Sequence, residues 1–276
     1  MLDGDKIKFD RSWKSSKEAN YSHWTRKKPQ NQIQFAFRNH WITFNKIIKK
    51  NKLKQKRVLE VGCGRGSLSA YFADNKWECT LLDSSSKAIS IAKHYFKKNK
   101  LKASYLVADC KKIPYPEKSF DLVFSIGLLE HFKNPEKIIK EQIRVLDKGG
   151  LFIGYIVPEI KNNIQDQYEW INKIFTLLTK SKNNKNRKKK IYRTNYMCNF
   201  YKQILKKNNL MNIKSSGIYP VPMISISKSF PFTLMDINIE KVIVNHFEKL
   251  LYDDFNNSWL CNEKKGQAIL VWGTKK

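Results

Sequence analysis

The stretch VLEVGCGRG, residues 58–66, decides the fold: it joins an apolar run that contains one acid, Glu60, to the glycines Gly62, Gly64 and Gly66. Glycine-rich turns that follow a strand commonly bind a nucleotide, but the dinucleotide-binding turn has the wider spacing G-x-G-x-x-G. A carboxylate two residues before the first glycine would also repel a pyrophosphate. The stretch therefore predicts a ligand that is a nucleoside with a cationic tail, not a dinucleotide.

Apolar periodicity alternates between strand and helix from residue 57 to residue 157. Strands are expected at residues 57–61, 78–82, 105–108, 120–126 and 151–157, with helices between them. The helix before the fifth strand should begin at Asn134-Pro135-Glu136, which supply a cap, a proline at the first helical position and an acid. It should end at Gly149-Gly150. Such alternation predicts an α/β fold with a doubly wound, mostly parallel sheet.

In a parallel sheet of this kind the ligand lies at the carboxyl ends of the strands. Asp83 ends the second expected strand, about twenty residues beyond the glycines, where an acid binds a ribose diol. Asp109 follows the third strand and can accept a hydrogen bond from an adenine amine, and Glu60 can balance a ligand ammonium directly or through water. This set fits adenosine with an amino-acid tail, which is S-adenosylmethionine.

Four motifs resemble those of class I S-adenosylmethionine-dependent methyltransferases and occur in the same order. They are VLEVGCGRG, LLDSS, VADCKKIPYPEKSFDLVFSIGLLEHF and VLDKGGLF. The likeness is to the type 11 group, which includes quinone-biosynthesis methyltransferases, and covers residues 57–157. It implies that Glu60, Gly62, Gly64 and Gly66 bind the methionine end, Asp83 the ribose, and Asp109 and Cys110 the adenine edge, while Ser125 lines the methyl-donor pocket. Cys63 and Ser84 lie inside the same motifs and complete the expected donor-binding set, although a cysteine here more often only packs.

His131 is the one histidine near the expected donor pocket. It can act as the general base that takes the proton of an acceptor hydroxyl, and the alternative is that it only orients its loop. A neutral amine or a thiolate acceptor would need no base. In every case the donor product would be S-adenosylhomocysteine.

Residues 1–50 are expected to form a helical extension or lid, and residues 51–276 the methyltransferase domain. Apolar residues at helical spacing should pack against the sheet: Ile33, Phe37, Trp41, Phe44 and Ile48. Tyr21, His23 and Trp24 precede that helix and are candidates for a substrate lid. An insertion after the fifth strand, residues 159–193, offers Tyr168, Trp170 and Tyr192 as candidates for the acceptor pocket, with core packing as the alternative.

The tail reads as a helix at 195–208, a strand at 213–219, a helix at 236–252 and a strand at 267–273. The family places its sixth and seventh strands there, with the seventh antiparallel, so the resemblance implies a Rossmann-like sheet of seven strands.

The charge and the cysteine content of the chain limit the functions that it can have. The net charge of +29 suggests that the protein binds nucleic acid. However, the lysines are scattered along the chain, and the abundance of Asn and Ile indicates a bias toward A/T-rich codons. Positive charge is concentrated in one tract, residues 180–190, KSKNNKNRKKK. That tract is interpreted as a solvated loop, with an anion or RNA contact as the alternative. The five cysteines include no C-x-x-C pair, so they should be reduced and no metal site is expected. A polar start and the lack of a long apolar run favour a soluble, cytoplasmic protein.

Three functions follow from these observations. The first is methyl transfer to a small-molecule acceptor, which the aromatic additions favour. The second is RNA methylation, against which SIGLLEHF differs from the N-P-P-Y type of segment that binds an exocyclic base amine. The third is a non-catalytic donor-binding protein, which the intact donor set disfavours.

Overall fold

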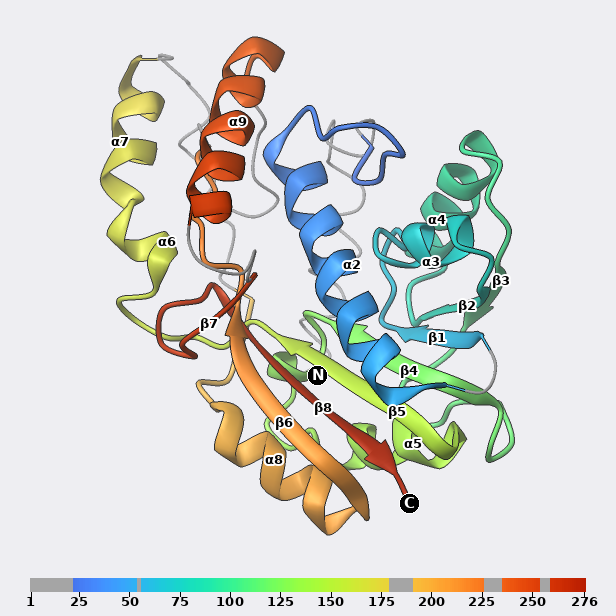
Figure 1. Cartoon of the computed structure of the whole chain (residues 1–276). Helices are drawn as coiled ribbons and strands as arrows, with labels where there is room; N and C mark the ends of the chain where they lie inside the picture. Colours follow the sequence, from blue (N-terminus) through green and yellow to red (C-terminus); the bar gives the residue numbers. More distant parts are fainter. Residues whose placement is uncertain (1–21, 54–55, 179–190, 226–234, 254–258) are drawn as a thin grey trace.

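The computed structural model describes residues 22–53, 56–178, 191–225, 235–253 and 259–276 (Figure 1). Tyr21 and the basic tract 180–190 lie outside these described residues, so the expectations placed on them stay predictions.

A single mixed sheet organises the chain, with the strand order β3-β2-β1-β4-β5-β8-β6-β7. The strands are β1 Arg57–Val61, β2 Glu78–Asp83, β3 Ser104–Val107, β4 Phe120–Ile126, β5 Leu146–Ile156, β6 Leu210–Ile218, β7 Leu260–Cys261 and β8 Ala268–Lys275. Strands β1 to β5 are parallel, and β8 is inserted antiparallel between β5 and β6. The predicted doubly wound, mostly parallel sheet is confirmed. The count of seven strands was wrong, because the two-residue β7 adds an eighth.

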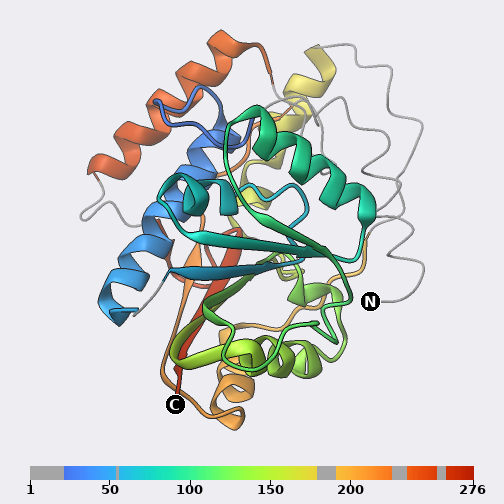
Figure 2. The same ribbon diagram turned by 90° about the vertical axis from the view of Figure 1, so that its right-hand side faces the viewer.

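Helices cover both faces of this sheet (Figures 1 and 2). One face packs against α2 (Gln32–Asn51), α3 (Ser69–Asp74) and α4 (Ser86–Lys98), and the other against α5 (Glu136–Val145) and α8 (Cys198–Lys207). The remaining helices are α6 (Ile164–Gln167), α7 (Glu169–Leu178), α9 (Ile237–Asp253) and the short 3-10 helix η2 (Leu129–His131).

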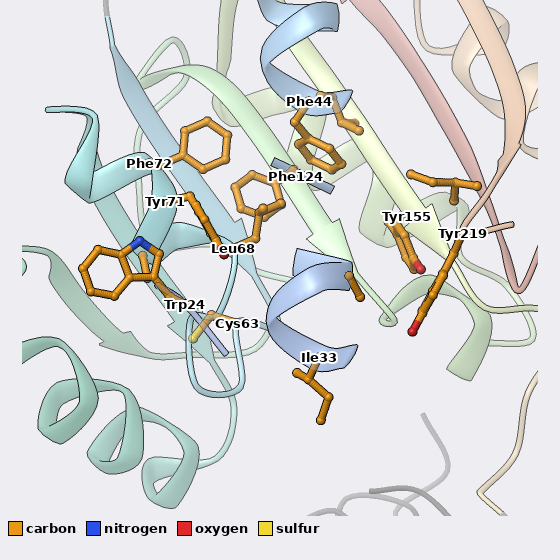
Figure 3. Close-up of a cluster of buried hydrophobic side chains, with 14 of the residues drawn as sticks. Trp24, Ile33, Phe44, Cys63, Leu68, Tyr71, Phe72, Phe124, Tyr155 and Tyr219 are labelled. Carbon is orange, nitrogen blue, oxygen red and sulfur yellow. The ribbon is translucent and has the colours of Figure 1, made fainter. Parts of the chain in front are cut away.

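Helix α2 packs on the sheet as its apolar spacing predicts. Ile33, Phe44 and Ile48 are buried, and Phe37 and Trp41 are partly buried against the same cluster. The ring of Phe44 contacts Phe124 of β4 edge-on, with a centroid distance of 5.6 Å. Figure 3 shows this aromatic core between α2 and the sheet.

The helix before β5 ends earlier than its sequence predicts. Asn134 Oδ1 accepts a hydrogen bond from the backbone N of Glu136 at 3.1 Å, as expected of a cap, but α5 stops at Val145 and not at Gly149-Gly150. The ammonium of Lys275, from the last strand, donates to the carbonyl oxygens of Ile143 and Leu146 at 2.8 and 2.7 Å. A cation that satisfies the last carbonyls stabilises a helix end, and this one comes from a residue too distant in sequence to be foreseen.

Candidate active site

The glycine turn after β1 has a backbone that only glycine adopts readily. The φ angles of Gly62, Gly64 and Gly66 are +71°, +52° and +71°. A Cβ on Gly66 would lie 2.4 Å from Leu81 Cδ2, so the third glycine also lets α4 and β2 pack closely on the turn.

The amides of this turn are used inside the protein. The backbone N atoms of Gly62 and Cys63 donate to the carbonyl of Leu82 at 2.8 and 3.0 Å, and Gly66 N donates to Cys63 O at 2.8 Å. A pyrophosphate-binding turn presents such N–H groups to its ligand. In this turn they bond to carbonyl oxygens of the protein, and the exclusion of a dinucleotide stays a prediction.

Asp83 connects the end of β2 to the glycine turn. Its Oδ2 accepts from Gly64 N and its Oδ1 from Ser85 N, both at 2.9 Å. Each carboxylate oxygen can accept more than one hydrogen bond. The turn thus fixes the orientation of the acid, while Ser84 beside it is exposed.

Glu60 is buried below the turn. Ser69 Oγ donates to its Oε2 at 2.5 Å, and burial raises the pKa of Glu60 to about 8, against the opposing effect of the bonds from Ser69. The carboxyl therefore carries a proton at neutral pH unless a cation comes near. Cys63, also buried, has its thiol pKa raised by burial, which fits packing better than chemistry.

The end of β3 combines polar and apolar groups. Asp109 is exposed and accepts a hydrogen bond from the backbone N of Lys111 at 2.9 Å, and burial raises the pKa of Cys110 to about 12. Val107, which pairs in register with Asp83, has 52% of its surface exposed. The exposure of Val107 could not be predicted, because an apolar residue inside a strand usually indicates core.

Beyond β4 lie Ser125, Glu130 and His131, all buried. Neither Ser125 Oγ nor Glu130 Oε2 has a hydrogen-bond partner within the described ranges. The Nδ1 of His131 lies 2.7 Å from the carbonyl oxygen of Tyr192, which can only accept, so Nδ1 carries the hydrogen and Nε2 has the lone pair. Nε2 is 3.9 Å from Glu130 Oε1, and burial raises the pKa of Glu130 to about 7. In the neutral imidazole this contact places the hydrogen on Nδ1, and a role of His131 as general base stays a prediction.

Comparison with known proteins agrees with this geometry. Residues 59–154 match the family described as "Methyltransferase domain". Residues 59–154 are a class I methyltransferase domain. That family uses S-adenosylmethionine as its cofactor.

Relatives of the methyltransferase domain differ in their acceptors. The ubiquinone biosynthesis O-methyltransferase of Pelagibacter ubique is 34% identical over 113 residues, which are 41% of this chain and 47% of that protein. Ajmaline N-methyltransferase of Rauvolfia serpentina is 35% identical over 103 residues, 36% of this chain and 35% of that protein. The chain thus spans less than half the length of these relatives.

A solved structure resembles nearly the whole chain. It is an S-adenosylmethionine-dependent methyltransferase of Thermotoga maritima described as a possible histamine N-methyltransferase, with a TM-score of 0.55, 17% identity, and coverage of 98% of this chain and 99% of that one. This likeness shows the fold alone.

The chemistry of the expected donor-binding residues is compatible with S-adenosylmethionine. Asp83 and Asp109 offer carboxylate oxygens and Glu60 a buried acid, while their roles at the ribose, the adenine edge and the ammonium stay predictions. Among the described residues, no three or more of His, Cys, Asp or Glu are grouped in a way that could hold a metal ion.

The segment before α2 crosses the glycine turn of the domain. His23 Nδ1 is 2.8 Å from Ser67 Oγ, its Nε2 is 3.2 Å from Arg65 Nη1, and its ring stacks on Phe37 at 5.3 Å. Trp24 is buried, with its ring against Tyr71, so it belongs to the core. The predicted lid therefore contacts the donor turn through His23.

The three aromatic candidates of the insertion after β5 differ in their surroundings. Tyr168 and Trp170 are 38% and 58% exposed, whereas the backbone of Tyr192 contacts His131. The structure does not bring Tyr168 and Trp170 to the donor-binding residues, and their role in acceptor binding stays a prediction. Within the described ranges, no helix has both the length and the apolar character needed to cross a bilayer.

Proposed function

We propose that this protein transfers the methyl group of S-adenosylmethionine to a small-molecule acceptor. The observation that carries the proposal is Asp83, whose carboxylate is oriented by the amides of Gly64 and Ser85 at the point where a methyltransferase domain binds the donor ribose. The positive φ angles of the three glycines and the buried acid Glu60 support the same ligand.

When bound, the donor supplies a sulfonium methyl that is already activated, so the protein mainly has to align an acceptor lone pair with the S–CH3 bond. Alignment of this kind contributes about 7 to 11 kcal/mol in favourable cases. His131 Nε2 would accept the proton that a hydroxyl acceptor gives up when it is methylated. A neutral amine would lose its proton to solvent afterwards.

The small-molecule acceptor is supported by the names of the relatives, a ubiquinone O-methyltransferase and an ajmaline N-methyltransferase. Incubation of the purified protein with labelled S-adenosylmethionine and fractionated metabolite extracts tests the proposal. We expect label in a small molecule. Donor binding without label in any fraction would instead favour a non-catalytic donor-binding protein.

RNA is the second candidate acceptor, and only the net charge of +29 favours it. Replacing Lys188, Lys189 and Lys190 by glutamine separates the two. We expect turnover of a small acceptor to stay within about twofold, because solvated charges contribute little. If RNA were the substrate, the salt dependence of RNA binding would flatten by about 0.7 to 0.9 log unit per lost phosphate contact, and label would enter RNA.

A further inference from the structure

The carboxyl edge of the sheet has two halves. The residues expected to bind the donor come from β1, β2, β3 and the end of β4, which are neighbours in the order β3-β2-β1-β4. The next strands along the same edge are β5, β8 and β6. Tyr155, the penultimate residue of β5, and Tyr219, directly after β6, lie in this second half.

Tyr155 adjoins the end of the donor half. It pairs in register with Ile126, the last residue of β4, and its carbonyl accepts a hydrogen bond from Gly127 N at 2.9 Å. Only 4% of Tyr155 is exposed, yet its hydroxyl forms no hydrogen bond within the part of the chain that the structure describes. This hydroxyl is not one of the fully buried polar atoms that lack a partner, so it is open to a ligand.

Tyr219 has an unusual backbone. Its φ is +69°, in the left-handed region where a bulky residue is rare. Two hydrogen bonds hold it there: Tyr219 N donates to Trp259 O, and Gln267 N donates to Tyr219 O, both at 3.1 Å. Such an outlier persists only where the surrounding structure imposes it, and it occurs often at ligand sites.

The two tyrosines belong to a cluster of uncharged aromatic rings. His40 lies 4.9 Å from Tyr155 and 5.5 Å from Tyr219, and Tyr219 stacks on Trp259 at 5.0 Å (centroid distances). Trp259 Nε1 donates to His40 Nδ1 at 2.7 Å, and burial lowers the pKa of His40 to about 3, so the imidazole is neutral. Figure 3 shows Tyr155 and Tyr219 side by side, with their hydroxyls on the same side.

Two acids lie near these rings. Glu240, near Tyr219, is engaged by Gln32 N at 2.9 Å and Met235 N at 3.1 Å. Glu130, near Tyr155, is buried, and the charge of Arg193 favours its ionised form. Burial also raises the pKa of both tyrosines, which keeps their hydroxyls neutral.

We infer that Tyr155 and Tyr219 recognise the methyl acceptor, and that the acceptor is an uncharged, flat ring compound whose polar substituent hydrogen-bonds their hydroxyls. The inference rests on the proposed function, because it uses the donor half to locate the acceptor half. Flat rings pack well against aromatic side chains. A charged ring would lose its hydration against neutral rings, and the acids nearby already have partners, Glu240 in N–H donors and Glu130 in Arg193.

The test uses 2-naphthol as the probe, with naphthalene and 2-naphthoate for comparison. Binding is measured by calorimetry with the full chain saturated by S-adenosylhomocysteine. We expect 2-naphthol to bind more tightly than either comparison compound. Tyr155→Phe and Tyr219→Phe should each weaken the binding of 2-naphthol about two- to tenfold, because each removes one neutral hydrogen bond. Neither substitution should change the affinity for naphthalene. The matched control is Tyr115→Phe, since Tyr115 packs on Phe120 at the opposite end of β4.

The outcomes separate the inference from the proposed function. If the wild-type protein did not bind S-adenosylhomocysteine, the proposed function itself would be contradicted. With that ligand bound, tighter binding of 2-naphthoate, no binding of 2-naphthol, or unchanged 2-naphthol affinity in both tyrosine variants would each overturn the inference alone.

Discussion

Donor binding should release a proton from Glu60. Burial raises the pKa of this carboxyl to about 8, so at pH 7 it is about 90% protonated in the free protein. An ammonium beside it favours the ionised form, and the carboxyl then gives up its proton on binding. We therefore expect about 0.9 proton released per site at pH 7 and about 0.2 at pH 8.5. By linkage, donor affinity should rise roughly eightfold per pH unit near pH 7.

Calorimetry with S-adenosylhomocysteine in buffers of different ionisation enthalpy measures this release. The slope of the observed enthalpy against the buffer enthalpy gives the number of protons. Glu60→Gln should abolish the slope, whereas Glu78→Gln, an exposed acid in β2, should leave it unchanged. A wild-type slope near zero at pH 7 would refute the assignment of Glu60 to the ammonium, even if the donor binds tightly.

Two further predictions concern Asp83 and Gln32. Asp83→Ala should weaken donor binding by about 1.5 to 3 kcal/mol, the range for hydrogen bonds to a charged group, or about ten- to a hundredfold by calorimetry. Asp74→Ala, which removes a surface ion pair with Arg26, is its control, and equal affinities in the two folded variants would contradict the ribose assignment. Gln32→Leu should lower the free energy of unfolding by about 2 to 4 kcal/mol in a denaturant titration, because it leaves the buried N and O of Ile224 unpaired and removes one donor from Glu240. A loss below about 0.5 kcal/mol would show that these bonds contribute little.

The sequence predicted the donor half of the sheet well because its signals are local. Strand β1, the glycine turn and Asp83 lie within thirty residues, and each obeys a rule about neighbouring positions, such as glycine where φ is positive. The bounds of β1 and β4 match the predicted ranges residue for residue. Alternation of strand and helix then leaves little freedom in the order of the first five strands.

The failures arose where a distant residue decides the local structure. Lys275 ends α5 from the other end of the chain, and Trp259 holds the backbone of Tyr219 in its left-handed conformation. Tyr155 lies in the apolar run FIGYI, where an aromatic residue usually indicates core, and nothing in that run shows that its hydroxyl is unpaired. A tyrosine inside an otherwise aliphatic strand was the one available signal.

The two halves of the site therefore differ in how they are built. The donor half is oriented by hydrogen bonds between residues close in sequence, such as Gly64 to Asp83. The acceptor half joins distant segments: the side-chain amide of Gln32, in α2, bonds both the N and the O of Ile224 at 2.8 Å, and His40 of α2 bonds Trp259. We therefore expect substitutions in the proposed acceptor half to change which ring compound is recognised, while the bonds that orient Asp83 stay intact. Helix α2 supplies both Gln32 and His40, so a shift of this helix would move the proposed acceptor half as one unit. The glycine turn has its own bonds to β2, which such a shift would not break.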